Sequence, residues 1–474
     1  MSDKEFVLEP NMHIHLIGIG GSGMSAIAQV LQGRGFVVSG SDMNLNEITA
    51  VLQSNGATIY EGHKAEQIAG AEVVVISSAI PETNPELIAA KAENIPVLKR
   101  AQFLGLLMAD RIGIAVAGTH GKTSTTGMIA QILVEAELDP TVIVGGVVPS
   151  LGSNGRFGEG DYFIVEADEY DRMFHGLKPE VIIITNLEHD HPDIYATEAD
   201  YVTAFEEFAQ LLPEGGHLIV CGADAGVQKL LKQLKLSDVD VSTYGIADEE
   251  NEDVTYRLQA VDCRPNQLGG TDFLIEMEDQ MIGLARLRVP GDHNVLNALA
   301  ATAVAIDLDI DFNVIRTALA NFSGINRRFQ LIGEQGSVTV IDDYAHHPTE
   351  IQATLKAARQ RYPGRRLWAI WQPHTFSRTK LLLDEFAHSF DDADRVVALD
   401  IYRSRETDTL GLDSGKVVEA MNHPKAVHVG DRRDAANYVL DRIFPDDVVL
   451  TLGAGDGNKV GEWILEGLAK KTGN

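Results

Sequence analysis

Residues 115–128 read AVAGTHGKTSTTGM and combine the end of an apolar run, two glycines and a Gly-Lys-Thr triplet. Gly118 and Gly121 allow the backbone to curl so that its N–H groups point at phosphate oxygens. Lys122 can neutralise the β and γ phosphates of a nucleotide, and Thr123 can offer its hydroxyl to Mg²⁺. Val116 stands where a Walker A loop has its first glycine, so the loop is shortened. The stretch predicts a phosphate-binding loop between a buried strand and a helix.

Short apolar runs rich in β-branched residues alternate with helix-like segments along the chain, which is typical of parallel α/β domains. Glycine, histidine or carboxylate residues follow most of these runs. Ligands of open parallel sheets bind beyond the carboxyl ends of the strands, so we expect binding sites there. The runs are HIHLIGI (13–19), VVVISS (73–78), IGIAVA (112–117), DYFIV (161–165), VIIIT (181–185), VTVI (338–341), LWAIW (367–371) and VVLTL (448–452).

The chain has 474 residues, which is too long for one hydrophobic core. The apolar runs divide it into three predicted α/β domains at residues 1–108, 109–325 and 326–474. The formal net charge of −30 disfavours nucleic acid and anionic lipid as partners.

Cys221 and Cys263 are the only cysteines, so no disulfide framework is expected. The start MSDKEFVLEP lacks the apolar segment of a signal peptide, and no apolar run approaches the roughly 20 residues of a membrane helix. We therefore expect a cytoplasmic protein without membrane insertion.

A second glycine-rich turn, GIGGSG at 18–23, follows an apolar strand and precedes a helical run. Its spacing fits a dinucleotide-type turn, in which backbone N–H groups meet a pyrophosphate. Asp42 lies about 20 residues further on, where an acid often binds a ribose. A tight turn without a ligand is the alternative, and the turn does not distinguish a nicotinamide cofactor from another diphosphate nucleotide.

Glu166 and His191 follow two strands that should neighbour the strand of the phosphate loop. Glu166 is the better direct ligand for Mg²⁺, because imidazole suits softer metals. The pair His189 and His191 taken alone is equally compatible with an ordinary loop.

Asp292, His293 and Asn294 open a run that predicts a helix, NVLNALAATAVAI. Asn294 and Asn297 share one helix face, and a capped helix with a polar edge explains this pattern without a ligand.

Tyr344, His346, His374 and Arg378 follow two strands of the last domain. The guanidinium of an arginine can grip a carboxylate through two parallel hydrogen bonds. Arg378 is therefore a candidate for binding an acidic group, although an isolated arginine is more often a surface residue.

Taken together, these motifs resemble those of the Mur ligases, ATP-dependent enzymes that join amino acids to a UDP-linked muramoyl acceptor. The shortened loop is that family's own form. Within the family, the chain is most similar to members that join L-alanine to UDP-N-acetylmuramate, and a ligase that attaches a recycled murein tripeptide is the alternative. The matching motifs are GIGGSGMS, AGTHGKTST, EADE, TNLEHDHPD, GDHNVLNALAA, RRF, DDYAHHPTE, QPHTFSRT and GAGD.

The resemblance implies a Rossmann-like N-terminal domain that binds the UDP sugar and a central P-loop ATPase-like domain with a parallel sheet that binds ATP. It implies a C-terminal Rossmann-like α/β domain that brings in the amino acid. The implied partners are UDP-N-acetylmuramate, L-alanine and ATP, with Mg²⁺ or Mn²⁺ as cofactor, in a monomer or homodimer. The implied reaction passes through an acyl phosphate.

The resemblance also implies the site residues. Those for ATP are Gly118, Thr119, His120, Gly121, Lys122, Thr123, Ser124, His293, Asn294, Arg327 and Asp343. Those for the UDP sugar are Gly18, Gly20, Gly21, Ser22, Gly23, Met24, Ser25, Asp42, Ser78 and Ala79. Those for the amino acid are Tyr344, His346, His374 and Arg378. The metal ligands are Thr123, Glu166 and His191, and the catalytic residues are Lys122, Glu166, His191, His346 and Arg378.

Two departures from the family stand out. Several sister ligases carry a carbamylated lysine after the metal-binding histidine, but here no lysine occurs between Lys178 and Lys229. Thr375 follows His374, where some alanine-adding relatives have arginine. Two other classes predict different behaviour: a nicotinamide dehydrogenase would not use the phosphate loop, and a nucleotide-dependent switch would bind ATP without forming an amide.

Overall fold

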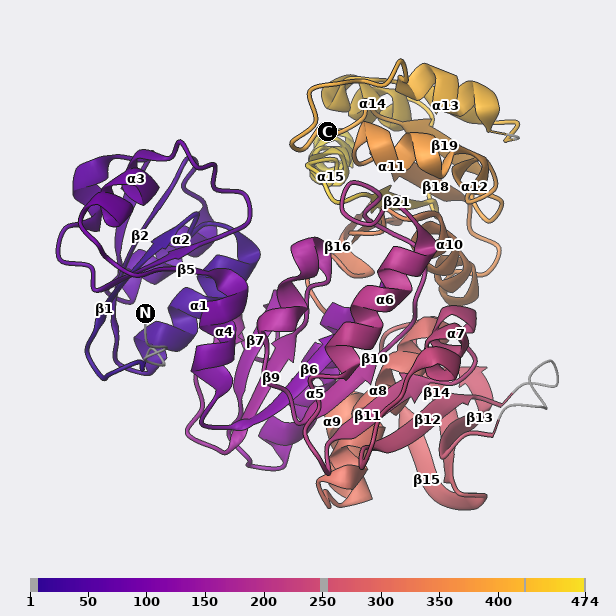
Figure 1. The fold of residues 1–474 in the computed structure, drawn as a ribbon. Coiled ribbons are helices and arrows are strands. Elements are labelled where there is room, and N and C mark those ends of the chain that lie inside the picture. Colours follow the sequence, from indigo (N-terminus) through magenta and orange to yellow (C-terminus); the bar gives the residue numbers. More distant parts are fainter. Residues whose placement is uncertain (1–6, 248–254, 422, 473–474) are drawn as a thin grey trace.

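Three α/β lobes follow one another along the chain, and each is built around its own sheet (Figure 1). The computed structural model describes residues 7–247, 255–421 and 423–472. The central lobe meets the N-terminal lobe (indigo) on one side and the C-terminal lobe (orange to yellow) at its top. The three sheets span residues 13–99, 112–286 and 330–452, which fall inside the three predicted domain ranges.

The N-terminal sheet is parallel, with the strand order β3-β2-β1-β4-β5. The order reverses between β1 and β4, so the glycine turn after β1 opens at a crevice suited to a ligand. The strands are β1 (His13–Ile17), β2 (Val37–Asp42), β3 (Thr58–Glu61), β4 (Val73–Ile76) and β5 (Val97–Lys99). The helices are α1 (Ser22–Gly33), α2 (Glu47–Ser54), η1 (Ala65–Ile68), α3 (Pro85–Ala92) and α4 (Arg100–Met108).

The central sheet has ten strands in the order β15-β14-β13-β12-β11-β10-β6-β9-β7-β8. Its strands are β6 (Ile112–Ala117), β7 (Thr141–Val148), β8 (Ser153–Arg156), β9 (Tyr162–Glu166), β10 (Val181–Ile184), β11 (His217–Cys221), β12 (Asp240–Ile246), β13 (Leu258–Pro265), β14 (Thr271–Met277) and β15 (Gln280–Arg286). Its helices are α5 (Lys122–Glu135), η2 (Tyr170–Gly176), α6 (Glu198–Ala209), α7 (Ala225–Gln233), α8 (Asp292–Asp307) and α9 (Phe312–Asn321).

The strands from β7 to β13 in that order run parallel, which confirms the predicted parallel core. β8, β14 and β15 are antiparallel and extend the two edges. These edge strands were not predicted, because no polar motif marks their ends in the sequence. The phosphate loop follows β6. This strand lies between β10 and β9, which both come later in the sequence.

Alternate residues of the central strands enter two different cores, as the period of a strand requires. On β9, Phe163 and Val165 join one core, whereas Ile164 joins the core on the opposite face. The latter core also contains apolar residues of α5, α8 and α9. Helix α5, the helix predicted after the phosphate loop, is therefore held against the sheet by its apolar residues.

The C-terminal sheet has the order β16-β17-β21-β18-β19-β20, in which only β16 is antiparallel. Its strands are β16 (Gln330–Gln335), β17 (Val338–Asp343), β18 (Leu367–Trp371), β19 (Arg395–Ala398), β20 (Ala426–His428) and β21 (Val448–Leu452). Its helices are α10 (Pro348–Arg361), α11 (Phe376–Leu381), α12 (Leu383–Ala387), α13 (Ser414–Ala420), α14 (Arg432–Leu440) and α15 (Lys459–Thr472).

Helix α1 of the N-terminal lobe packs directly against β7 and β8 of the central lobe. A Cβ atom at Gly155 would lie 2.3 Å from the carbonyl oxygen of Ala26, so only glycine allows this approach. The Asn154 side chain is buried here and donates to the carbonyl of Ser22 at 2.8 Å. The start of α1 is thereby tied to the central sheet. Within the described residues, no helix is both long and apolar enough to cross a membrane.

Candidate active site

The phosphate loop has the backbone that its glycines predict. Gly118 and Gly121 have φ angles of 132° and 83°, which disfavour residues with a Cβ atom. Gly121 precedes the first residue of α5, so the free N–H groups of the first helical turn can bind an anion. The N–H groups of Thr119 and His120 instead donate to Asn186, at 3.0 and 2.8 Å. The part of the loop open to phosphate is therefore its second half.

Lys122 points back under the loop rather than outward. Its Nζ donates to the carbonyl of Thr119 at 3.0 Å and to Glu169 at 2.9 Å. Burial would lower the pKa of Lys122, but Glu169 and the neighbouring carboxylates outweigh burial and raise it. The ammonium therefore stays charged beside the position where phosphate would bind.

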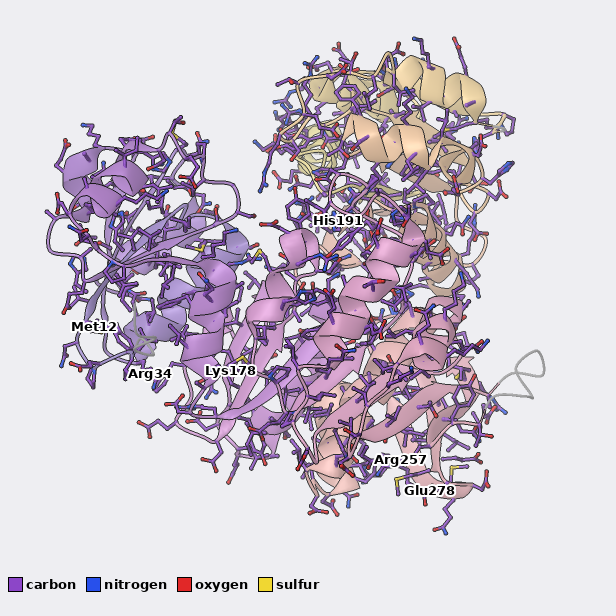
Figure 2. The ribbon with its side chains drawn as sticks, viewed as in Figure 1. Met12, Arg34, Lys178, His191, Arg257 and Glu278 are labelled. Carbon is purple, nitrogen blue, oxygen red and sulfur yellow. The ribbon has the colours of Figure 1, made fainter. Side chains whose placement is uncertain are left out.

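The three predicted metal ligands fall into two groups. The Thr123 hydroxyl donates to Glu166 at 3.0 Å, and the other oxygen of Glu166 accepts the N–H of Gly145 at 2.6 Å. His191 lies near the top of the central lobe (Figure 2), where its Nε2 is 3.6 Å from Glu169. The structure thus joins Thr123 to Glu166 and places His191 beside Glu169, a carboxylate that was not predicted for the site.

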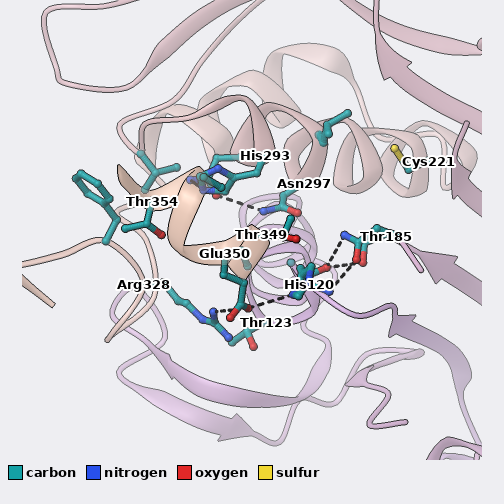
Figure 3. Close-up of a pocket in the computed structure, with 18 of the residues that line it drawn as sticks. His120, Thr123, Thr185, Cys221, His293, Asn297, Arg328, Thr349, Glu350 and Thr354 are labelled. Atoms are coloured by element: carbon teal, nitrogen blue, oxygen red, sulfur yellow. Dashed lines mark hydrogen bonds and ion pairs between the residues drawn. The ribbon is translucent and has the colours of Figure 1, made fainter. Parts of the chain in front are cut away.

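A cavity of about 370 Å³ opens beside the start of α5 (Figure 3). Burial lowers the pKa of His293 to about 4, so its imidazole is neutral at pH 7. Burial raises the pKa of Asp343 to about 6, although Arg328 opposes this. The predicted ATP residues that line this cavity are His120, Gly121, Thr123, Ser124, His293, Asn294 and Asp343.

Arg327 was predicted to bind ATP, but its neighbour Arg328 is the arginine of the pair that lines the smaller cavity. Arg327 is not among the residues that line this cavity; it donates to Asp342 at 3.0 Å and to the carbonyl of Gly453 at 2.9 Å. Both arginines belong to the quoted RRF motif, and which of them faces the cavity depends on the backbone turn before β16, where Arg327 has a positive φ of 62°.

A larger cavity of about 950 Å³ is lined by residues of all three lobes. The predicted sugar-binding residues on it are Gly18, Gly21, Ser22, Gly23, Met24, Asp42, Ser78 and Ala79. Gly20 donates its N–H to the Asp42 carboxylate at 2.9 Å. Ser25 is fully buried and donates to the carbonyl of Ser22 at 2.9 Å, so its hydroxyl supports the turn from behind.

Arg100 also lines this cavity, although it was not among the residues predicted for the site. Its guanidinium lies so close to Gly23 that a Cβ there would be 2.0 Å from Nη1, and it donates to Asp168 at 2.6 Å. Arg100 begins the helix that leads into the central lobe, and no recognisable motif surrounds it. It brings a cation to the glycine turn from outside the turn's own sequence.

The C-terminal lobe brings Tyr344, His374 and Arg378 to the same large cavity, next to His191. His346 adjoins them, with its ring 5.9 Å from that of His374. Burial lowers the pKa of His346 to about 3 and that of His374 to about 4, so both imidazoles are neutral at pH 7. Arg378 is buried, and its guanidinium already binds Asp190 at 3.0 Å.

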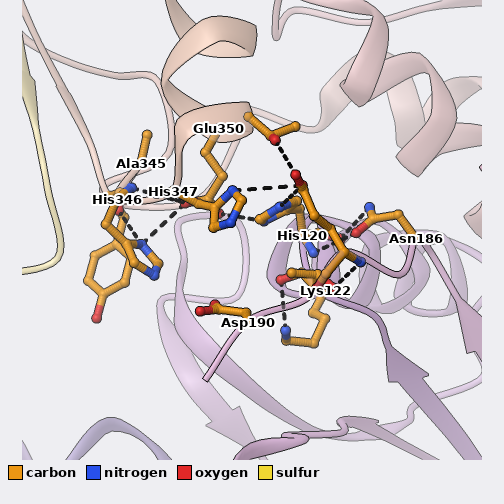
Figure 4. A network of polar contacts seen from close by, with 12 residues as sticks. His120, Lys122, Asn186, Asp190, Ala345, His346, His347 and Glu350 are labelled. Atoms are coloured by element: carbon orange, nitrogen blue, oxygen red, sulfur yellow. Dashed lines mark hydrogen bonds and ion pairs between the residues drawn. The ribbon is translucent and has the colours of Figure 1, made fainter. Parts of the chain in front are cut away.

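A polar network joins the phosphate loop to the C-terminal lobe (Figure 4). His120 lies 3.0 Å from Glu188 and 3.3 Å from Glu350, and the Thr349 hydroxyl donates to Glu188 at 2.8 Å. Burial would lower the pKa of His120, but Glu188 and Glu350 outweigh burial and raise it to about 9. The imidazolium therefore bridges carboxylates of two lobes.

The fold and these cavities define a class of protein. A phosphate loop at the carboxyl end of an interior strand of a parallel sheet, a nucleotide-sized cavity beside it and a larger cavity shared with a dinucleotide-type turn are features of an enzyme that uses a nucleotide to act on a second substrate.

Comparison with known proteins identifies the family. The family model "Mur ligase family, catalytic domain" matches residues 13–112, "Mur ligase middle domain" matches 116–305, and "Mur ligase, glutamate ligase domain" matches 327–455. The chain belongs to the Mur ligase family.

Curated relatives align over nearly their full length. The UDP-N-acetylmuramate–L-alanine ligase of Salinibacter ruber is 44% identical, over 96% of this chain and 94% of the relative. The enzyme of the same name from Acidobacterium capsulatum is 44% identical, over 97% of this chain and 98% of the relative.

Two solved structures are similar in fold to nearly the whole of this chain. The UDP-N-acetylmuramate–alanine ligase of Thermotoga maritima superposes with a TM-score of 0.80 and 28% identity, covering 98% of this chain and 100% of that one. A murein peptide ligase from Psychrobacter arcticus superposes with a TM-score of 0.72 and 27% identity, covering 96% and 98%.

Proposed function

We propose that this chain is an ATP-dependent ligase that joins L-alanine to the carboxylate of UDP-N-acetylmuramate, in the synthesis of peptidoglycan precursors. The observation that carries the proposal is the chain of contacts from one cavity to the other. Thr123 lines the smaller cavity and His191 the larger one. Between them, Glu169 lies 2.9 Å from Lys122 and 3.6 Å from His191. The extent of similarity to curated alanine ligases supports the same reaction.

The chemical problem is that a carboxylate is a poor electrophile, because its oxygen is a poor leaving group. Transfer of the γ-phosphoryl group of ATP to a carboxylate oxygen gives ADP and an acyl phosphate. The alanine amine then attacks the acyl carbon, the bond to the phosphate oxygen breaks, and the amine loses a proton to give the amide. Lys122 stabilises the negative charge of the transferring group, so most of its contribution is electrostatic.

The side chains near the phosphate loop fit a magnesium ion. The hydroxyl of Thr123 and the carboxylate of Glu166 lie 3.0 Å apart and are oxygen donors, which Mg²⁺ prefers. We assign these two residues and His191 to the metal, which when bound neutralises charge on phosphate oxygens. Glu166 keeps one oxygen on the N–H of Gly145, which fixes its direction toward Thr123.

The nucleotide would occupy the smaller cavity, with its phosphates at the start of α5. His293 and Asn294 line the far part of this cavity and are assigned to the adenine. Asp343 lines it from the C-terminal lobe, and Arg327, also assigned to ATP, binds the neighbouring Asp342 at 3.0 Å. The glycine turn at 18–23 and Asp42 would hold the UDP part of the acceptor.

The alanine would enter from the C-terminal lobe, between Tyr344, His346, His374 and Arg378. Neutral imidazoles can accept a hydrogen bond from the amine, but a group with a pKa of about 3 is a weak base. We therefore assign His346 to orienting the amine. The interlobe contacts of His120 would keep water from the acyl phosphate when the lobes are closed.

The decisive experiment measures phosphate release with ATP, Mg²⁺ and UDP-N-acetylmuramate, with each amino acid or the murein tripeptide added in turn. We expect release to depend on L-alanine and ¹⁸O from the acceptor carboxylate to appear in the phosphate. Release that depends on the tripeptide would instead identify a recycling ligase. Phosphate without ¹⁸O would reject the acyl-phosphate route. We expect the reaction to take place in the cytoplasm.

A further inference from the structure

Asp190 and Arg378 form a buried ion pair between two lobes. Asp190 lies in the segment after β10, and Arg378 lies in α11 of the C-terminal lobe. The Nε atom of Arg378 is 3.0 Å from one Asp190 oxygen, and its Nη2 is 3.2 Å from the other. Each side chain is only 6% exposed. The contact is a two-point fork between a guanidinium and a carboxylate.

The pair is well satisfied, which a buried pair requires if it is to offset the cost of removing two charges from water. Asp190 also accepts the N–H of His191 at 2.7 Å. The Asp190 carboxylate is therefore held by donors from both lobes, the N–H of His191 and the guanidinium of Arg378.

The pair decides which edge of the Arg378 guanidinium remains available. An arginine has five N–H donors, and Asp190 takes the one on Nε and one on Nη2. The donors left over lie on Nη1 and on the other side of Nη2. Nη1 donates one N–H to Nδ1 of His374 at 3.3 Å, and both residues line the large cavity. One N–H on Nη1 and the second N–H on Nη2 are then left over. The free edge thus forms a second fork on the side of the predicted alanine pocket.

We propose that Asp190 is a positioning residue for the amino-acid substrate: it fixes the guanidinium of Arg378 so that only the Nη1–Nη2 edge receives the substrate carboxylate. This inference rests on the proposed function, because it takes the ligand of Arg378 to be the carboxylate of alanine. The sequence alone predicted only that the guanidinium of Arg378 would bind an acidic group, with no partner inside the protein. In the proposal, Arg378 has two pairs of donors: Nε and Nη2 bind Asp190, and the Nη1–Nη2 edge binds the substrate carboxylate.

Asp190 also couples two parts of the site, because it is adjacent in sequence to His191. The central lobe supplies both the metal-site histidine and the anion that orients Arg378, while the C-terminal lobe supplies the arginine itself. The carboxylate-binding edge therefore points correctly only when the two lobes are docked. If the ion pair served only to hold the two lobes together, the orientation of the other guanidinium edge of Arg378 would not matter. Steady-state kinetics can separate this structural role from the orienting role.

The experiment compares Asp190→Asn, Arg378→Lys and the double variant with the wild-type protein. Asp190→Asn keeps the shape of the side chain and removes its charge, and Arg378→Lys keeps a cation without the fork. Lys356→Ala is the control, because Lys356 forms an exposed interlobe pair with Asp292 at 3.0 Å. The KM values for L-alanine, ATP and UDP-N-acetylmuramate and the kcat are measured for each protein.

We expect Asp190→Asn to raise the KM for L-alanine about ten- to a hundredfold, since misplacement of a binding group by about 1 Å has effects of this size. The KM values for ATP and UDP-N-acetylmuramate should not change. The double variant should be no worse for L-alanine than Arg378→Lys alone, because Asp190 acts through Arg378. Lys356→Ala should match the wild type.

Three results would overturn the inference: an unchanged KM for L-alanine in Asp190→Asn, an equal rise in all three KM values, or additive effects in the double variant. If Asp190→Asn fails to fold, Asp190→Glu replaces it, with a smaller rise confined to the KM for L-alanine. A wild-type protein without alanine-dependent phosphate release would refute the proposed function before any variant is compared.

Discussion

Lys122→Met removes the ammonium group from the phosphate loop and keeps the length of the side chain. In the structure, this ammonium is the charge beside the first turn of α5, where the γ-phosphoryl group would lie. Loss of one such preorganised charge costs about 10²–10³ in turnover. Phosphate release should therefore fall by at least this factor. Binding of UDP-N-acetylmuramate should persist, because other residues line the large cavity.

The same substitution should destabilise the central lobe. Glu169 is 3% exposed and would lose its partner at 2.9 Å, which leaves a buried carboxylate with His191 at 3.6 Å. Breaking a buried pair costs about 3–5 kcal/mol. His191 can take over part of the interaction, so we expect the lower end, about 3 kcal/mol. Lys122→Met with Glu169→Gln removes the orphaned charge and should recover most of this stability without recovering activity.

The assays are phosphate release, calorimetric titration with UDP-N-acetylmuramate, and denaturant unfolding of the single and double variants. Wild-type turnover in Lys122→Met would refute the assignment of the phosphate loop. A double variant as unstable as the single one would show that the orphaned Glu169 charge is not the cause of the destabilisation.

Arg378→Ala should raise the KM for L-alanine more than the KM for ATP in steady-state kinetics, because Arg378 lines the larger cavity and not the smaller one. His191→Ala should shift the Mg²⁺ titration of phosphate release to higher concentrations, because it removes a proposed metal ligand. His120, between Glu188 and Glu350, has a pKa of about 9, raised above the value of about 6.5 in the unfolded chain. The stability that it contributes is complete below about pH 6.5 and is lost as the pH rises through 9. Relative to His120→Gln, the unfolding free energy of the wild type should therefore fall by about 3 kcal/mol over this range in denaturant unfolding.

Each of these three predictions has an outcome that contradicts it. An equal rise in both KM values would argue against a substrate carboxylate at Arg378. An unaltered Mg²⁺ titration would remove His191 from the metal site. A stability difference between the wild type and His120→Gln that does not vary with pH would show that His120 is not an imidazolium in the folded protein.

Much of the fold was predictable because strand periodicity and glycine turns act locally. The runs at 112–117 and 181–185 became β6 and β10, with polar residues at the predicted sheet edge. The antiparallel edge strands were not predicted, because short hairpins carry no polar motif at their ends. Gly121 was identifiable because a positive φ before a helix requires glycine.

The site was less predictable, because contacts between lobes join residues far apart in sequence. Nothing in the sequence pairs Asp190 with Arg378, which is 188 residues away. Arg100 was missed because a single cation at the start of a helix has no periodicity or spacing that marks it. Whether Arg327 or Arg328 enters a cavity depends on one backbone turn, which residue type alone does not determine.

The amino-acid sequence by itself determined the three α/β units, the phosphate loop and the resemblance to the Mur ligases, because these depend on the local order of apolar, glycine and charged residues. Only the tertiary structure decided which charges meet: Lys122 with Glu169, His120 with Glu350, and Arg378 with Asp190. The physical reason is that electrostatic pairing falls off with distance in space, not in sequence, so partners are set by how the lobes pack.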